Sequence, residues 1–290
     1  GRLSRPLRSL VLGPTMRASD LGPACGASRM RGGRGGKALF GWFLLVTCLA
    51  TLPLKAQAQT ATTSSLFVER FQTPLIDPRW IVSDGWHSGE WFSSEWRRDQ
   101  VGLGPQGLVI SLDRNAGDGE KPYVSGEIST SEEYLYGYFE ARLRMPRGRG
   151  LVSAFFTFTR PEGVESWNEI DMELTGYDPR RIELVYHVAG QATLQVEELP
   201  FDASEDFHTY AFEWRRNAIR WYIDNELVHV SRRGRVAELT RPQRMFSSLW
   251  NSERMPRWLG VIDPSESPWK MHVACMAYAP RYEGRSLCVD

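Results

Sequence analysis

The sequence predicts an all-β protein, folded as a sandwich or a barrel. Apolar and polar residues alternate with a period of two in several segments, as the strands of a half-buried sheet require. Gly, Asn, Asp and Pro turns separate these segments at short intervals. Between them we find none of the long helical patterns that a parallel α/β fold needs. The fold class therefore rests on periodicity, on turn spacing and on the lack of helical stretches.

The expected strands follow one another closely from residue 108 onwards. The clearest alternation lies at 208–214, where ring-bearing residues alternate with Thr, Ala and Glu. We expect strands at 108–112, 136–145, 151–159, 181–190, 192–199 and 208–231, the last interrupted by turns at 215–218 and 224–226. No Gly/Pro/Ser-rich linker and no repeat divides residues 65–290, so we expect this region to form one domain.

The first 58 residues have the composition of a leader. Residues 1–37 are rich in Gly and Arg, residues 38–54 are apolar, and the small-residue site Ala56-Gln57-Ala58 follows. These are the three parts of a secretory signal peptide, and the apolar run is shorter than the ~20 residues of a membrane span. A retained anchor and a buried helix are the alternatives. We expect a secreted or periplasmic protein, without stable membrane insertion once the signal is cleaved.

Two methionines, Met16 and Met30, lie inside this leader, and either could initiate translation. A start at Met30 leaves a compact basic segment before the apolar run. Our hypothesis is that residues 1–29 are upstream reading-frame sequence that is not translated. Residues 59–64 would then form a short N-terminal tail ahead of the domain at 65–290.

Charge and ligand spacing argue against two functional classes. Residues 1–58 hold 9 of the 35 basic and 1 of the 35 acidic residues, so the remainder has a net charge of about −8. Phosphate binding needs a basic face, and no basic stripe is present, so no nucleic-acid partner is expected. The five histidines are scattered and no Cys–His cluster has the spacing of a zinc site, so no metal site is expected.

The cysteines agree with export. Cys25 and Cys48 lie in the leader, and only Cys275 and Cys288 remain in the domain. In an oxidising compartment these two could form a disulfide that holds the C-terminal tail. Two free thiols are the alternative.

The segment "SWNEIDMELTG" at 166–176 carries three acids in step. Glu169, Asp171 and Glu173 alternate strictly with apolar residues, which favours a strand over the helix that an i, i+4 pair of Glu would allow. The three acids then share one sheet face. This face is either solvated surface or an active site. Repulsion between like charges ~6–7 Å apart and the aromatic neighbours make a bare surface less favourable.

Glycoside hydrolysis is the chemistry that needs such an arrangement. It uses one carboxylate as nucleophile or base and one carboxylic acid as proton donor. Two carboxyl groups ~5–5.5 Å apart imply retention through a covalent glycosyl-enzyme. Asp171 lies between Glu169 and Glu173, where it can help to separate their pKa values.

The residues that surround the acids resemble glycoside hydrolase family 16. "WNEIDMELTG" is similar to the family's active-site strand, with the core pattern E-[apolar]-D-x-E. Three further segments resemble the bacterial lichenases of that family: "SGEISTSEEYLYGYFEARLRMPRGRGLVSAFFTFT", "DFHTYAFEWRRNAIRWYIDNELVH" and "SSLWNSERMPRWLG". The resemblance implies a concanavalin A-like jelly-roll β-sandwich with a substrate cleft on its concave face. It assigns Glu169 as nucleophile, Glu173 as acid/base and Asp171 as the assisting residue.

The resemblance also implies a set of substrate-binding residues. Aromatic faces would stack on sugar rings and carboxylates would accept bonds from sugar hydroxyls, with core packing as the alternative for each aromatic side chain. These residues are Trp86, Phe92, Glu127, Trp167, Tyr186, His187 and Trp250. The expected partner is a polysaccharide, and the protein is expected to be a monomer.

Several departures from the lichenase pattern bear on specificity. Lichenases carry Asn at the positions of Ser88, Val185 and Ser248, Arg at that of Ser129, and Tyr at that of His187. Ala274 stands where the family often has an Asp ligand for calcium, so we expect no cofactor, with a structural calcium ion as the weakly supported alternative. The expected function is a secreted retaining endo-β-glycanase that acts on mixed-linkage β-1,3-1,4-glucan or on a bacterial exopolysaccharide. A xyloglucan-type transglycosylase and a non-catalytic lectin are the alternatives.

Overall fold

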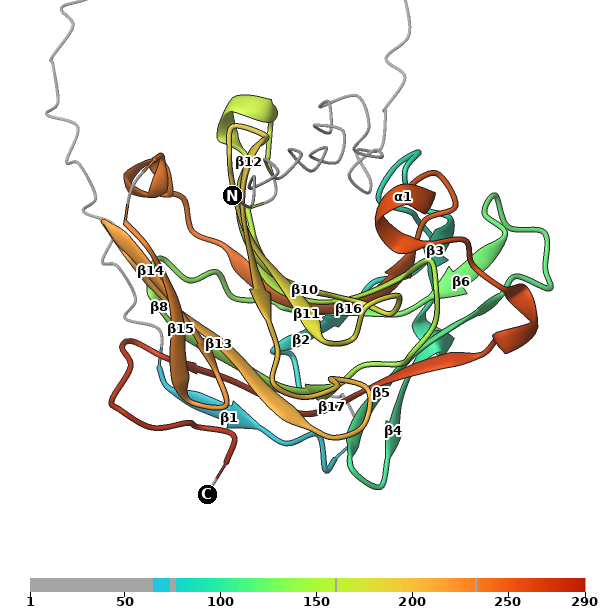
Figure 1. Ribbon diagram of the computed structural model, residues 1–290, viewed down its shortest axis with the longest axis horizontal. Helices are drawn as coiled ribbons and strands as arrows, with labels where there is room; N and C mark the ends of the chain where they lie inside the picture. The colour runs from blue at the N-terminus through green and yellow to red at the C-terminus, as the bar shows by residue number, and fades with distance from the viewer. Residues whose placement is uncertain (1–64, 74–76, 160, 233, 290) are drawn as a thin grey trace, which may run out of the picture. The chain divides into compact units, whose positions relative to one another are not determined.

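The computed structural model describes residues 65–73, 77–159, 161–232 and 234–289 (Figure 1). The expected leader at 1–58 and the short tail at 59–64 lie outside these residues. Within the described residues, no helix has the length and apolar composition needed to cross a membrane.

The described chain forms two sheets, almost entirely antiparallel, as the sequence predicts. The larger sheet has the order β15-β14-β13-β8-β17-β5-β6-β3, with β1 beside β17 and β4 beside β5. Its strands are β1 (Phe67–Glu69), β3 (Ser94–Trp96), β4 (Val101–Gly104), β5 (Gly107–Arg114), β6 (Tyr123–Ser125), β8 (Gly137–Arg144), β13 (His208–Arg215), β14 (Ala218–Ile223), β15 (Glu226–Ser231) and β17 (Trp269–Ala279). Only the β3–β6 pair is parallel among the described strands.

The smaller sheet has the order β12-β11-β10-β9-β16-β7-β2. Its strands are β2 (Trp80–Val82), β7 (Glu127–Thr130), β9 (Leu151–Phe158), β10 (Asn168–Thr175), β11 (Arg181–Val188), β12 (Gln191–Glu198) and β16 (Arg244–Asn251). The helical turns are short: η2 (Arg98–Gln100), η3 (Val164–Ser166), η4 (Val236–Glu238), α1 (Pro256–Leu259) and η5 (Pro264–Glu266). This sheet is curved, and β10, β11 and β16 line the inside of the curve (Figure 1).

Alternation along the strands places the hydrophobic core between the two sheets. Ile170, Met172 and Leu174 of β10 are at most 2% exposed and belong to this core. Phe155 of β9 meets Phe212 of β13 across the interface, with ring centroids 5.9 Å apart. The sandwich of jelly-roll type that the sequence and its family resemblance predict is therefore confirmed, and the acids of β10 lie on the concave face.

The outer face of the larger sheet is covered by the C-terminal tail. Cys275 of β17 forms a disulfide with Cys288. Glu140 of β8, fully buried, accepts hydrogen bonds from the Tyr138 hydroxyl (3.0 Å), from the backbone N–H of Leu287 (2.7 Å) and from Ser286. The disulfide and the carboxylate together fix residues 286–288 against the sheet.

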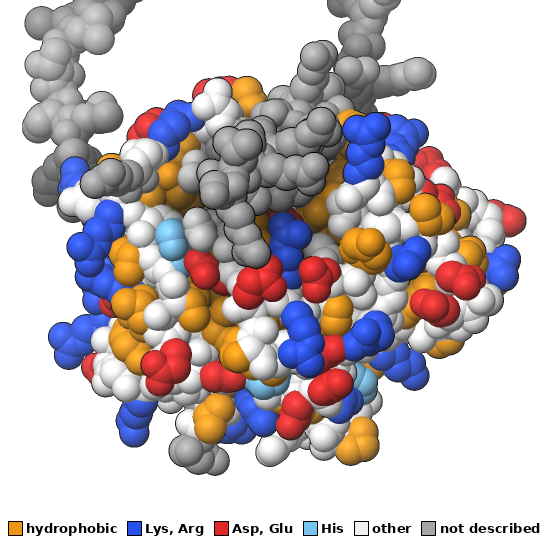
Figure 2. All heavy atoms as spheres, viewed as in Figure 1, with side chains coloured by type: hydrophobic (Ala, Val, Ile, Leu, Met, Phe, Trp, Pro, Cys, Tyr) orange, Lys and Arg blue, Asp and Glu red, His pale blue; other side chains and the backbone are white. Residues whose placement is uncertain are grey.

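The surface carries charges of both signs. On the face shown in Figure 2, Lys and Arg side chains lie interspersed with Asp and Glu across the described residues. Mixed charge of this kind gives a surface without one dominant sign.

Candidate active site

The three acids occupy one face of β10, a strand and not a helix, as their alternation predicts. The register with β11 and β9 fixes their neighbours. Glu169 lies between His187 and Phe158, Asp171 between Val185 and Phe156, and Glu173 between Glu183 and Ala154. Because cross-strand partners point to the same face, these side chains form a continuous patch on the concave side of the sheet.

Glu169 is held by the tryptophan two residues before it. The Trp167 indole N–H donates a hydrogen bond to Glu169 Oε2 at 2.6 Å. The Trp167 ring also stacks on the His187 imidazole, with centroids 5.4 Å apart and planes 9° apart. Trp167 is only 3% exposed, and its ring also meets that of Phe158, with centroids 6.3 Å apart. An N–H donated to a carboxylate favours the ionised form, which a nucleophile requires.

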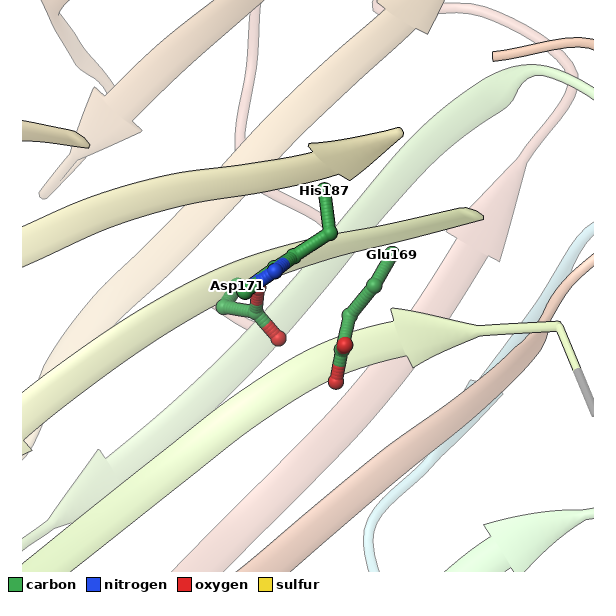
Figure 3. A group of neighbouring side chains, drawn as sticks. All are labelled: Glu169, Asp171 and His187. Carbon is green, nitrogen blue, oxygen red and sulfur yellow. The ribbon is translucent and has the colours of Figure 1, made fainter. Parts of the chain in front are cut away.

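Asp171 is the most enclosed of the three acids, at 6% exposure. Burial, followed by the negative charges of Glu169 and Glu173, raises the pKa of Asp171 well above its usual range. His187 Nε2 lies 3.6 Å from Asp171 Oδ2, and Figure 3 shows both side chains beside Glu169. Burial lowers the pKa of His187 although Glu169 opposes this effect. Burial thus favours the neutral form of each group.

Glu173 has the pKa of a proton donor. Burial, then the charge of Glu183, then that of Glu169 raise the pKa of Glu173 from 4.5 to about 8. A carboxyl group with this pKa is protonated at neutral pH, as a general acid must be. The face thus holds one carboxyl group that accepts the Trp167 N–H and one that keeps its proton.

Glu127 of β7 lies further across the same sheet. Its side chain is 4% exposed, and Ser83 donates a hydrogen bond to Oε1 at 2.7 Å. Burial and the charge of Glu169 raise the pKa of Glu127 to about 7, while the Ser83 bond opposes the rise. Its cross-strand partner on β16 is Ser248. Glu127 therefore interacts electrostatically with Glu169. Its contact with substrate stays a prediction.

Aromatic side chains form one wall of the site. Phe92 packs on Trp250 with centroids 4.6 Å apart, and Trp258 of α1 lies 5.9 Å from Trp250. Trp86 is 41% exposed and packs against Trp96, with ring centroids 6.2 Å apart. Exposed aromatic rings can stack on sugar rings. Trp250 is only 6% exposed, and for Phe92, Trp86 and Trp250 substrate contact stays a prediction.

Tyr186 corrects the sequence prediction. It is 2% exposed and belongs to the core between the sheets, opposite Ile170 of β10. Its neighbours Val185 and His187 point to the concave face, so the period of two turns Tyr186 away from the acids. The prediction that Tyr186 binds substrate is therefore wrong.

Two residues at this site have no counterpart in the sequence predictions. Glu183 of β11 is the cross-strand partner of Glu173. The Trp258 indole donates to Glu183 Oε1 at 2.9 Å. The alternation of "RIELVYHV" places Glu183 on the same face as His187, and this was the available signal for Glu183.

One group of side chains at the site has the composition of a metal-ligand set. Ligand atoms of Glu169, Asp171 and His187 lie within 4.8 Å of one another. These side chains already interact with Trp167 and with each other, and we assign no ion to them. Ala274 of β17 presents only a methyl group, so the residues present do not fit a calcium ion at that position.

Two carboxyl groups with different environments on one sheet face, bordered by aromatic rings, are the arrangement that a glycoside hydrolase uses. The chain belongs to the glycosyl hydrolases family 16, whose sequence profile matches residues 88–269. The resemblance found in the sequence is thereby confirmed.

Characterised relatives share most of the domain. A beta-glucanase of Acetivibrio thermocellus is 34% identical over 239 residues, 82% of this chain and 69% of that protein. The endo-1,3-1,4-beta-glycanase ExoK of Rhizobium meliloti is 32% identical over 221 residues, 73% of this chain and 78% of that protein. The crystal structure of a lichenase from a mouse hindgut metagenome superposes with a TM-score of 0.70 at 30% identity, covering 75% of this chain and 100% of the other.

Proposed function

We propose that this protein is a retaining endo-β-glucanase that cleaves internal β-glucosidic bonds of mixed-linkage β-1,3-1,4-glucan or of a related bacterial exopolysaccharide. One observation carries the proposal. Two carboxyl groups on one strand have environments that separate their roles, since Trp167 donates to Glu169 while burial and negative charge keep the proton on Glu173.

The reaction takes place in two steps. Glu169 attacks the anomeric carbon while Glu173 gives its proton to the departing glycosidic oxygen, which forms a covalent glycosyl-enzyme. Water then attacks the same carbon, Glu173 takes a proton from it, and Glu169 is released as a carboxylate. Asp171 lies between them, and its raised pKa favours the neutral form, which limits the repulsion among the three acids.

The choice between the two substrates rests on the concave face. Two of the relatives named above are an endo-1,3-1,4-beta-glycanase and a beta-1,3-1,4-glucanase by their names, which supports mixed-linkage glucan as the substrate. Val185, Ser248 and Ser129 lie on this face where lichenases carry larger polar groups, which reduces the hydrogen bonds available to glucose hydroxyls. This difference supports a bacterial exopolysaccharide as the second candidate substrate.

A panel of barley β-glucan, lichenan, laminarin, xyloglucan and an acidic exopolysaccharide, with linkage analysis of the products, tests the proposal. We expect internal cleavage of one mixed-linkage or exopolysaccharide substrate, and loss of at least ~100-fold in kcat for Glu169→Gln and Glu173→Gln. Activity that survives in Glu169→Gln would contradict the proposed roles. Transfer of the product to an added sugar acceptor would identify a transglycosylase, and binding without cleavage by the unmutated protein would identify a lectin.

We further propose that the protein is exported, that its leader is cleaved after Ala58, and that it acts as a monomer. The signal-like composition of residues 1–58 supports export. N-terminal sequencing of protein from the culture fluid and the periplasm tests the first two statements, and light scattering on a sizing column tests the third.

A further inference from the structure

A fourth carboxyl group, Glu183, lies beside the proposed acid without taking part in the reaction described above. It is the direct cross-strand partner of Glu173 in the β10–β11 pair. Partners in such a pair have Cβ atoms ~4.5–5.5 Å apart and point to the same face. Glu183 is 9% exposed, so little water screens its charge from Glu173.

The contacts of Glu183 favour its ionised form. Trp258 donates its indole N–H to Glu183 Oε1 at 2.9 Å, and Arg181 Nη2 lies 3.7 Å from the same oxygen. Burial raises the pKa of Glu183, and both of these contacts oppose the rise. In the described part of the chain no side chain donates a hydrogen bond to Glu173. Of the two neighbouring carboxyl groups, Glu173 is therefore the one that keeps a proton.

The other strand beside Glu173 brings no competing charge. β9 presents Ala154 opposite Glu173 and Phe156 beside it. On β10 itself, Asp171 lies two residues away, and its raised pKa favours its neutral form. Glu169 lies four residues away on the same face, and its charge raises the pKa of Glu173 less than that of Glu183 does.

The remaining charged or titratable groups are further removed from Glu173. His187 lies opposite Glu169 and is neutral, while Arg181 interacts with Glu183. Glu183 is therefore the negative charge directly across from the acid.

We propose that Glu183 is a positioning residue whose negative charge, held by Trp258 and Arg181, keeps the proton on Glu173 until a glycosidic oxygen accepts it. The inference rests on the proposed function, which makes Glu173 the acid. In the second half of the reaction the same charge repels ionised Glu173. This repulsion strengthens Glu173 as the base that takes a proton from water.

Titration of the Glu173 carboxyl carbon by ¹³C NMR, in substrate-free protein, tests the inference independently of any substrate. The signal is assigned by its disappearance in Glu173→Gln. We expect a midpoint of about 8 in the unmutated protein and a fall of about one pH unit or more in Glu183→Gln. Glu226→Gln is the matched control, because it removes one carboxylate from an exposed position on β15, in the other sheet.

Trp258→Phe is a second variant that keeps Glu183 but removes its donor. Without the indole N–H, ionised Glu183 is less stable, and Glu183 and Glu173 share one proton more evenly. The Glu173 midpoint should therefore fall by less than in Glu183→Gln. An unchanged midpoint in both variants, with near-native circular dichroism, would overturn the inference. A purely structural role for Glu183 would lower the unfolding temperature without moving this midpoint.

The alkaline limb of the kcat/KM profile on β-glucan should move to lower pH by the same amount in Glu183→Gln, with the acid limb unchanged. A shifted NMR midpoint in a protein that hydrolyses no polysaccharide would refute the proposed function and leave the charge coupling intact. If the unmutated protein hydrolyses β-glucan, but Glu183→Gln changes neither the pH profile of kcat/KM nor the Glu173 midpoint, only the role of Glu183 is refuted.

Discussion

Replacing Glu173 with glutamine should stabilise the folded protein at alkaline pH, although it removes the proposed acid of the reaction. Burial, Glu183 and Glu169 raise the pKa of Glu173 from 4.5 to about 8 in the folded state. Because the folded pKa is higher, the protonated side chain contributes stability that is fully present below pH 4.5. That contribution is lost as pH rises through 8. Glutamine cannot ionise, so the variant avoids this loss.

The magnitude follows from the difference between the two pKa values. Each unit of pKa difference corresponds to about 1.4 kcal/mol. The rise from 4.5 to about 8 therefore limits the loss of unfolding free energy, once Glu173 is fully ionised above pH 8, to about 5 kcal/mol. Glu173 keeps part of its surface exposed, so water relieves some of the penalty. Between pH 4 and pH 9, the unfolding free energy of Glu173→Gln should rise by about 2 kcal/mol relative to that of the unmutated protein.

Urea unfolding of both proteins at pH 4 and at pH 9, with the disulfide intact, measures this difference. Ionisation elsewhere largely cancels in the comparison, and Glu226→Gln reports what an exposed carboxylate contributes. At pH 4 the two proteins should differ by less than about 0.5 kcal/mol. A difference in unfolding free energy that is the same at both pH values would refute the reasoning, because it would mean that Glu173 has no raised pKa.

Three further predictions follow from contacts described above. Trp167→Phe removes the hydrogen bond to Glu169 while keeping an aromatic ring, so kcat on β-glucan should fall about tenfold, and an unchanged kcat would mean that the bond does not act on the nucleophile. Reducing the bond between Cys275 and Cys288, which are 13 residues apart, should lower the unfolding free energy by about 2–3 kcal/mol, measured by urea unfolding with and without reductant. Glu140→Ala leaves buried donors of the C-terminal tail unpaired and should destabilise by about 1–3 kcal/mol, with Glu226→Ala as the exposed control; equal effects of the two would contradict this account.

The sequence predicts the reactive strand well because β10 is long and its alternation is strict. Eight residues contain three acids and three apolar side chains in step, which determines both strand and face. The strands β2, β3 and β6 contain three residues each. Such short segments carry too few residues for a period to be recognised, so their positions follow from pairing in the folded protein.

Alternation alone would have avoided the error at Tyr186, whereas the partner of Glu173 depends on pairing register. The faces of β11 follow from its own alternation, which would have assigned Tyr186 to the core and Glu183 to the concave face. That Glu183 stands opposite Glu173 depends on the turn between β10 and β11, which the pattern does not specify. Trp258 reaches Glu183 from a four-residue helix 75 positions further along the chain. Long-range contacts of this kind leave no local signal in the sequence.

The tail held by Glu140 and the disulfide has a practical consequence. Residues 286–288 are fastened to the outer face of the larger sheet, whereas the reactive acids lie on the concave face of the smaller sheet (Figure 1). Val289, just beyond the fastened residues, is 51% exposed. A solid support or a fusion partner attached at the C-terminus would therefore leave the concave face open to a long polymer, and pulling on this attachment would load β8 and β17 rather than β10.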